Sequence, residues 1–283
     1  MLNKPFIVFG EVLWDAFPDE KRLGGAPLNF AYYFQRSGGN PIILSAVGRD
    51  KLGDEAKEKI RSLCLDVSYI QQIDKPTGMV KVSFKQQEHR FEIIRETAWE
   101  HIEYYNDELV NNTFGIYFGT VARVSQENRK TLDRIIDNIK EGIVFLDLNL
   151  REGFYDIKDV KNLLTRVNYL KINEEEAMHL RNNGLLRGSS FNEMVRYLTE
   201  NYNLKACCIT FGERGAIGGN ENDIVKVGGI RAKTGGDTVG CGDAFSAIWL
   251  ANLLKGKTIE ESLSKANEIG SRVASEKGAI IKI

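Results

Sequence analysis

Short apolar segments, each bounded by turn-forming residues, recur along this sequence. They cover residues 6–10, 42–47, 114–118, 143–148, 167–172 and 206–211. Nearly continuous apolar runs of this length are typical of β-strands that are buried on both faces. Helical patterns lie between them, such as the apolar positions 132, 135, 136 and 139 and a second pattern over 245–254. Alternating strands and helices predict a doubly wound α/β fold, with a mostly parallel sheet and helices on both faces.

The stretch 77–95 departs from this rhythm because its apolar residues alternate with polar ones, as in a hairpin with a turn at 86–88. The apolar face comprises Val80, Val82, Phe84, Phe91 and Ile93. A two-stranded hairpin is not stable alone, so this face must cover something. Two interpretations remain open: an edge extension of the main sheet, or a small β lid over a cleft, joined by residues 12–23.

Charge and composition exclude several kinds of partner. The 283 residues carry 38 Lys+Arg against 39 Asp+Glu, so neither nucleic acid nor a membrane surface is expected as a partner. The apolar runs are too short to span a bilayer. The N-terminus runs directly into the first strand, unlike a signal peptide, so we expect one cytoplasmic domain over 1–283. The four cysteines, at 64, 207, 208 and 241, form no C-x-x-C, and neither a disulfide framework nor a zinc site is predicted.

The densest chemical signal is the glycine-rich segment 235–245, which leads into the second helical pattern. Such a turn leaves backbone N–H groups unpaired at the helix N-terminus, and with the helix dipole they form a site for an anion. Asp243 stands beside this cradle, where a carboxylate suits deprotonation of a hydroxyl during phosphoryl transfer. An acidic residue in a first helical turn also suits an ordinary cap. On these residues alone, both interpretations are open.

Motifs of other nucleotide-dependent and hydrolytic enzymes are absent from the sequence. It has no G-x-x-x-x-G-K-[ST] loop, no protein-kinase motifs and no G-x-G-x-x-G at the first helix. It also has no G-x-S-x-G, and its three histidines give little support to a hydrolase triad.

Residues 236–245 resemble the C-terminal signature of the ribokinase-like (PfkB) carbohydrate kinases, in which D-T-x-G-A-G-D-x-F is usual. The one departure is Cys241, which stands where alanine is common. Residues 24–31 resemble the N-terminal signature of the same family, G-G-x-x-x-N-x-A. The resemblance covers nearly the whole chain in the right order. It implies a ribokinase-like fold and an enzyme that transfers phosphate from ATP to a sugar hydroxyl.

The resemblance assigns catalytic and substrate-binding roles to particular residues. It implies that Asp243 is the base, and that charge on the transferred group is neutralised by the N–H groups of Gly240, Cys241 and Gly242. It implies that the sugar is held by Asp15, Gly25 and Asn29, of which Asn29 would open the following helix. Without the resemblance, Asp15 would be taken as a turn residue and Asn29 as a helix cap.

ATP is the co-substrate and Mg²⁺ the cofactor that the resemblance implies. An N-x-x-E motif at Asn173 and Glu176 would organise Mg²⁺ and phosphate, mostly through water, which suits this ion. An acidic helical turn that complements the helix dipole is the alternative. The nucleotide-binding positions that the family pattern implies are Thr210, Gly212, Gly215 and Asn267.

The acceptor is suggested by four segments, 14–18, 25–29, 119–123 and 147–151, which look most like fructokinase-type members. They add Asn149 and Arg151 beside the transferred phosphate, where a guanidinium is suitable. Arg95 resembles a substrate-side arginine and suits a sugar hydroxyl or a carboxylate. Fructose is therefore expected, with 2-keto-3-deoxygluconate, ribose or a nucleoside as alternatives. A non-catalytic sugar-binding sensor on the same fold is the alternative from another class.

The resemblance also implies a monovalent cation and a homodimer. In the family, a loop beginning at the position of Asp237, with the backbone of Val239 and a strand near Gly278, often binds K⁺ beside the anion cradle. Ribokinase-like enzymes frequently pair through their lids, so the apolar face over 77–95 would suit a dimer.

Overall fold

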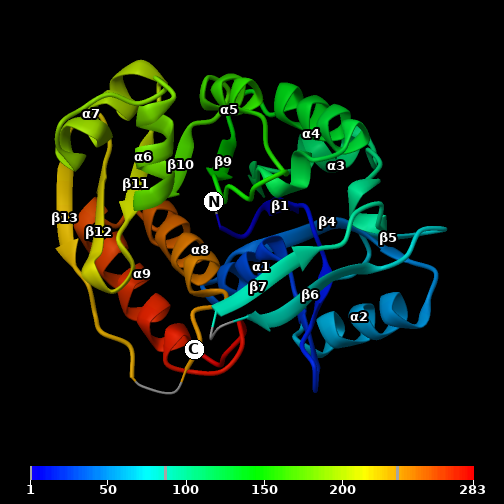
Figure 1. The fold of residues 1–283 in the computed structure, drawn as a ribbon. Helices are drawn as coiled ribbons and strands as arrows, with labels where there is room; N and C mark the ends of the chain where they lie inside the picture. Colours follow the sequence, from blue (N-terminus) through cyan, green and yellow to red (C-terminus); the bar gives the residue numbers. More distant parts are fainter. Residues whose placement is uncertain (1, 86–87, 234–235) are drawn as a thin grey trace.

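The computed structural model describes residues 2–85, 88–233 and 236–283, without the side chains of 82–85 and 88–91. In these ranges a nine-stranded sheet forms the centre of the molecule, in the order β13-β12-β11-β10-β9-β8-β1-β4-β5 (Figure 1). Its strands are β1 (Pro5–Phe9), β4 (Asn40–Gly48), β5 (Ile70–Ile73), β8 (Gly115–Gly119), β9 (Ile143–Asp147), β10 (Tyr169–Asn173), β11 (Ala206–Thr210), β12 (Gly215–Gly219) and β13 (Ile224–Gly228). The pairs from β5 to β11 are parallel, whereas β12 and β13 are antiparallel. Each of the six apolar runs of the sequence overlaps one strand of this sheet.

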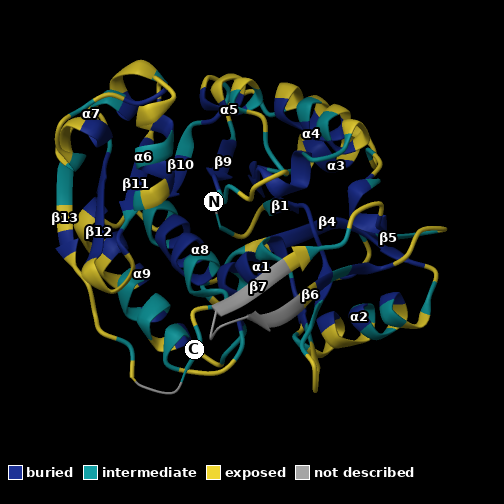
Figure 2. Cartoon of the chain, viewed as in Figure 1, coloured by how far each residue is buried: buried dark blue, intermediate teal, exposed yellow. Residues whose placement is uncertain are grey.

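Each face of the sheet packs against its own set of helices. In β1, Phe6 and Val8 belong to one hydrophobic cluster and Ile7 and Phe9 to another, as alternation along a buried strand requires. The first cluster includes α1 (Ala26–Arg36), α2 (Lys51–Ser62), α8 (Cys241–Leu254) and α9 (Ile259–Ala274). The second includes α3 (Asp107–Asn112), α4 (Gln126–Asn138), α5 (Ile157–Leu164), α6 (Glu174–Asn182) and α7 (Phe191–Asn201). Figure 2 shows buried strands between helices with exposed outer surfaces, which confirms the predicted doubly wound fold.

Helix capping divides the α-helices of the described chain into two groups. Seven begin with a side chain that accepts a backbone N–H: α2, α3, α4, α5, α6, α7 and α9. The other two, α1 and α8, begin at Gly25 and Gly240 and have no side-chain cap. The N-terminal N–H groups of these two helices are therefore the ones that no capping side chain satisfies.

A second sheet in the described ranges has four strands in the order β3-β2-β6-β7. They are β2 (Leu13–Ala16), β3 (Lys21–Gly24), β6 (Gly78–Lys85) and β7 (Glu88–Ile93). The interpretation of 77–95 as an edge extension of the main sheet is therefore wrong, and residues 12–23 join the hairpin as the lid interpretation predicts. The lid has a small core of its own, in which Leu13 and Val80 are buried and Phe17 and Ile93 pack against them.

Part of the sequence prediction for the lid falls outside the described residues. This applies to the side chains of Val82, Phe84 and Phe91 and to the turn at Gln86 and Gln87. Among the residues that are described, no helix is long and apolar enough to cross a membrane.

Because the lid has a separate core, we expect the same truncation to lower the global stability less in the lid than in the main sheet. Val8, in the main sheet, is 0% exposed and Val80, in the lid, 5%. We expect Val8→Ala to lower the free energy of unfolding by about 2 kcal/mol in urea. Val80→Ala should lower it by less than about 1 kcal/mol but speed hydrogen exchange in β2, β3 and β6, because only the lid opens. Equal losses of global stability, with no local effect in the lid, would contradict this division.

Candidate active site

The N-terminus of α8 lies where the glycine-rich segment predicts an anion cradle. Gly240 has φ 75°, in the left-handed region that favours glycine, and a Cβ there would lie 2.5 Å from Cβ of Ala279. Cys241, Gly242 and Asp243 form the first helical turn, and no side chain caps it. Asp243 is thus not a helix cap. Backbone N–H groups left open at a helix N-terminus, together with the dipole, favour a negatively charged group.

Asp243 meets a residue of the predicted sugar site. Its Oδ2 accepts a hydrogen bond of 2.8 Å from Nδ2 of Asn29, which is buried in α1. Asn29 lies in the interior of α1, so the expectation that it opens the helix is wrong; Gly25 is the N-cap. Oδ1 of Asn29 is buried and has no hydrogen-bond partner among the described residues. An unpaired buried acceptor beside a carboxylate suits a ligand hydroxyl.

The pKa of Asp243 is raised to about 6; burial raises it most, and the negative charge of Asp147 also raises it. The hydrogen bond from Asn29 and the charges of Lys171 and Arg151 lower it. At neutral pH the carboxylate is therefore ionised, with a pKa close enough to the working pH to accept a proton from a hydroxyl.

Asp15 and Gly25, the other predicted sugar residues, lie at the junction of the lid and α1. Burial raises the pKa of Asp15, on β2, to about 6, while the charge of Arg22 lowers it. A Cβ at Gly24 would lie 2.6 Å from Oδ2 of Asp15, and one at Gly25 would lie 2.2 Å from the carbonyl oxygen of Glu11. Gly25, with φ 113°, requires glycine because it faces a backbone carbonyl, whereas a larger residue at Gly24 would displace the Asp15 carboxylate.

Arg95, the predicted substrate-side arginine, follows the end of β7. Its Nε donates to Oε2 of Glu100 at 3.0 Å, and its guanidinium carbon lies 5.1 Å from the ring centre of Phe154. The side chain is 46% exposed. Its charge is therefore partly engaged by Glu100 and partly open to solvent.

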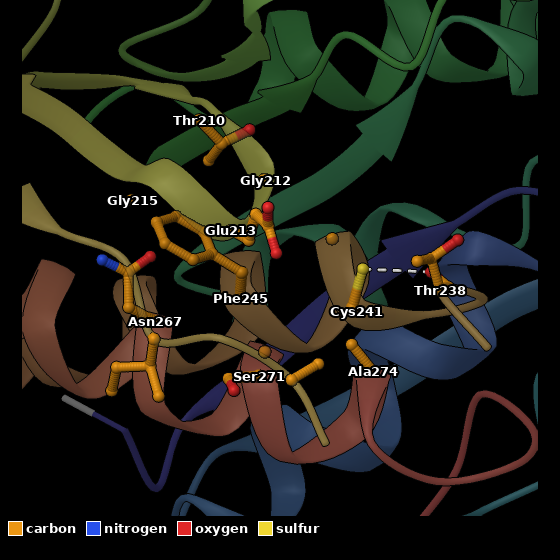
Figure 3. A pocket seen from close by; sticks show the side chains of 14 residues that line it. Thr210, Gly212, Glu213, Gly215, Thr238, Cys241, Phe245, Asn267, Ser271 and Ala274 are labelled. Carbon is orange, nitrogen blue, oxygen red and sulfur yellow. Dashed lines mark hydrogen bonds between the residues drawn. The ribbon is translucent and has the colours of Figure 1, made fainter. Parts of the chain in front are cut away.

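The predicted nucleotide positions converge on one cavity of about 360 Å³ (Figure 3). The sequence-predicted residues that line it are Thr210, Gly212, Gly215, Cys241, Gly242 and Asn267. Phe245 and Ile230 add apolar surface to the lining. Two residues of the first turn of α8, Cys241 and Gly242, belong to the lining, so a ligand in the cavity can contact the cradle. A largely apolar cavity with a few polar groups in its lining is typical of small-molecule sites.

Comparison with known proteins agrees with this geometry. The sequence model described as "pfkB family carbohydrate kinase" matches residues 3–283. The chain belongs to this family. It is therefore a sugar phosphotransferase, and both the ribokinase-like fold and the family predicted from the two signatures are confirmed.

Two relatives illustrate the range of the family around this kinase. An ATP-dependent 6-phosphofructokinase of Thermoanaerobacterium thermosaccharolyticum is 30% identical over 93% of this chain and 82% of its own. A fructokinase of Salmonella typhimurium is 26% identical over 99% of this chain and 96% of its own.

Among solved structures, a fructokinase of Xylella fastidiosa with bound ATP matches with a TM-score of 0.86 at 18% identity. That match covers 98% of this chain and 94% of the other. An uncharacterised sugar kinase of Pyrococcus horikoshii has a TM-score of 0.82 at 24% identity, covering 97% and 93%. At these identities the structures show the fold alone.

In this kinase the N-x-x-E motif forms a capping box. Oδ1 of Asn173 accepts the N–H of Glu176, and Oε2 of Glu176 accepts the N–H of Asn173, both at 2.8 Å. Oε1 of Glu176 accepts the N–H of Leu150 at 2.8 Å, which ties α6 to the loop after β9. Asn149 and Arg151 lie in this loop, Asn149 with φ 44° and Arg151 exposed. Glu176 thus has a structural role, and its role toward Mg²⁺ stays a prediction.

Asp237 and Val239 lie at the entrance to the cradle. Oδ1 of Asp237 accepts the N–H of Val239 at 3.1 Å, and Oδ2 accepts the N–H of Gly278 at 3.0 Å. Oδ2 also accepts a hydrogen bond from Arg22 at 3.2 Å. A guanidinium therefore already lies beside the carboxylate at which K⁺ is predicted.

A buried ion pair under the cradle was not predicted from the sequence. Nζ of Lys171, on β10, lies 3.0 Å from Oδ1 of Asp147, on β9, and a Cβ at Gly242 would lie 3.3 Å from the same Nζ. Oδ2 of Asp147 accepts from Ser246 at 2.7 Å and from Tyr117 at 3.4 Å. Burial lowers the pKa of Lys171, but Asp147 and Glu176 raise it more, so the side chain stays charged.

Glu11 is a second residue that sequence reasoning missed. It is 5% exposed, and burial raises its pKa to about 7, while backbone N–H groups oppose the shift and Asp243 adds to it. The sequence could have indicated both residues. Glu11 is an acid directly after the first strand, and Lys171 is a lysine inside an apolar run. Both lie toward the carboxyl ends of parallel strands, where ligands bind in such sheets.

The charges around Asp243 predict the pH dependence of turnover. Activity should rise with pH through an acid limb near 6, because Asp243 must lose its proton to act as a base. Lys171→Met removes a positive charge and should move the acid limb to higher pH by about one unit. Asp147→Asn removes a negative charge and should move the limb to lower pH. The measurement is kcat/KM against pH for variants that remain folded by circular dichroism. If both variants shifted the acid limb in the same direction, or if neither variant shifted it, the assignment of the limb to Asp243 would be contradicted.

Proposed function

We propose that this kinase transfers the γ-phosphoryl group of ATP to a hydroxyl of fructose. The observation that carries the proposal is the position of Asp243, on the first turn of the uncapped helix α8 and hydrogen-bonded to Asn29. Asp243 thus directly follows Cys241 and Gly242, which line the cavity that suits a nucleotide, and contacts Asn29, which suits a sugar. The fructokinase of Salmonella typhimurium, similar over nearly the whole chain, supports fructose as the acceptor.

The proposed reaction uses the residues as follows. Asp15, Gly25 and Asn29 hold the sugar, and Asp243 accepts the proton of its attacking hydroxyl. The hydroxyl oxygen forms a bond to the γ-phosphorus as the bond to the β,γ-bridging oxygen breaks, and ADP leaves. The N–H groups at the start of α8 neutralise charge on the transferred group.

A divalent and a monovalent cation are part of the proposal. In the described chain no three acidic, His or Cys side chains converge on a metal position, so Mg²⁺ would be held mainly by ATP phosphates and water near Asn173 and Glu176. When bound, Mg²⁺ supplies positive charge to the phosphates. K⁺ would bind at Asp237 and the backbone of Val239, next to the guanidinium of Arg22. A Vibrio cholerae fructokinase variant with bound potassium, similar in fold, supports this position.

We also propose that the active kinase is cytoplasmic and forms a homodimer through the lid. The support is the small size of the lid core, Leu13 and Val80 with Phe17 and Ile93, which leaves a four-stranded sheet with little packing of its own.

Asp243→Asn keeps the shape of the side chain but removes the base. We expect kcat to fall 10²–10⁴-fold, with little change in KM for ATP. Cys241→Ala is the matched control, because the cradle uses the backbone N–H at that position; its kcat should stay near wild type. Retention of wild-type kcat by Asp243→Asn would contradict the role of Asp243.

The same variant should be more stable than the wild type at pH 7. The pKa of Asp243 in the folded state, about 6, lies above its ordinary value of 3.8, so ionisation costs stability as pH rises through this window. Removing the carboxylate should raise the free energy of unfolding by about 3 kcal/mol. Equal stabilities of variant and wild type at pH 7 and at pH 3.5 would contradict the raised pKa.

The acceptor is tested by ATP consumption with fructose, fructose 6-phosphate, 2-keto-3-deoxygluconate, ribose and adenosine. Fructose 6-phosphate is the second candidate, favoured by the 6-phosphofructokinase that is 30% identical to this chain. We expect the highest kcat/KM with fructose. A higher value with another acceptor would replace fructose in the proposal, and turnover of none would contradict the assignment of a sugar acceptor from this panel.

A further inference from the structure

Arg22, on lid strand β3, contacts a residue of the cradle loop 215 positions away in the sequence. Its Nη1 donates to Oδ2 of Asp237 at 3.2 Å and so joins the lid to the loop that precedes α8. The other side of the guanidinium is held by the lid itself: Nε donates to Glu20 at 3.0 Å, and the group lies 4.6 Å from the ring centre of Phe17. The Arg22 and Asp237 side chains are 29% and 30% exposed, so solvent screens their interaction only in part.

Asp237 links this arginine to the cradle. Its two carboxylate oxygens accept the N–H groups of Val239, inside the loop that leads to Gly240, and of Gly278, in the C-terminal segment. Its own N–H donates to the carbonyl oxygen of Glu276 at 3.0 Å. The position of the Asp237 carboxylate therefore bears directly on how the backbone enters α8.

The other end of the connection is the predicted sugar residue Asp15. Arg22 and Asp15 are direct partners in the antiparallel register of β2 and β3. Because the two strands are hydrogen-bonded, a ligand that fixes Asp15 also fixes the backbone that carries Arg22. One continuous set of contacts thus runs from the sugar residue through Arg22 and Asp237 to the first turn of α8.

We propose that Arg22 is a positioning residue that couples sugar binding under the lid to ordering of the phosphate cradle, so that sugar and nucleotide bind cooperatively. The inference rests on the proposed sugar site at Asp15. Sugar binding holds β2 and β3 in place, Arg22 then holds Asp237, and the N–H groups of the cradle are fixed before phosphate arrives. By thermodynamic linkage, nucleotide must strengthen sugar binding by the same factor.

The first test measures coupling directly. The affinity for a non-hydrolysable ATP analogue is determined by calorimetry with and without saturating fructose, and again with fructose 6-phosphate. In the wild type we expect the sugar that is turned over to tighten analogue binding about fivefold to tenfold. Arg22→Met should reduce this factor below about twofold, and Arg22→Lys, which keeps the charge, should restore part of it. A loss of cooperativity is not expected from a residue that only stabilises the fold.

The matched control is Glu20→Gln, which weakens another ion pair of Arg22 but keeps its contact with Asp237, and should leave the coupling near wild type. A second measurement needs no sugar: Arg22→Met, but not Glu20→Gln, should speed hydrogen exchange at the amides of Val239 and Gly278. Unchanged coupling or unchanged exchange in Arg22→Met overturns the inference, even if fructose is phosphorylated. Absence of turnover with either sugar, with the exchange effect present, counts instead against the proposed acceptor.

Discussion

Helix α8 begins at a glycine that cannot cap it, and much of the site follows from this. Gly240 adopts a left-handed conformation against Ala279, where no other residue would fit without displacement. The N–H groups of the first turn are left for a ligand, and Asp243 belongs to the same turn. Base and anion site are therefore held in a fixed relation by a single element, and Gly25 at the start of α1 brings Asn29 to the same carboxylate.

The buried carboxylates around this turn explain why Asp243 can act as a base and why the site does little to stabilise the fold. Glu11 and Asp243 are held with raised pKa values mainly by burial, and Lys171 and Asp147 form an ion pair directly beneath them. Buried charges of this kind stabilise a fold only weakly, and unpaired ones destabilise it. The arrangement suits a site that must accept a proton near neutral pH and hold a phosphoryl group with many negative oxygens nearby.

The fold was largely predictable from local pattern, whereas the contacts of the site were only partly so. Six strands could be located from apolar runs, because a strand that is buried on both faces is apolar along its whole length. The cradle could be located from the glycines that precede Asp243. The antiparallel strands β12 and β13 left no such run, because β12 is buried but has glycine at three of its five positions, and β13, at the edge of the sheet, is mostly not buried. The ion pairs of Lys171 and Arg22 could not be recognised from the sequence. Their partners, Asp147 and Asp237, are distant in the sequence and come close only in the folded chain. Asn29 contacts Asp243, but the sequence misplaced it within its helix, since Gly25 is the N-cap.

The central claim is that one carboxylate, Asp243, lies between sugar and nucleotide at the start of α8. A crystal structure with fructose and a non-hydrolysable ATP analogue bound together would test it most directly. The account predicts one fructose hydroxyl within hydrogen-bonding distance of the Asp243 carboxylate, with the γ-phosphate analogue against the N–H groups of Gly240, Cys241 and Gly242. A fructose whose hydroxyls all lie beyond reach of Asp243, or a terminal phosphate bound away from α8, would contradict it.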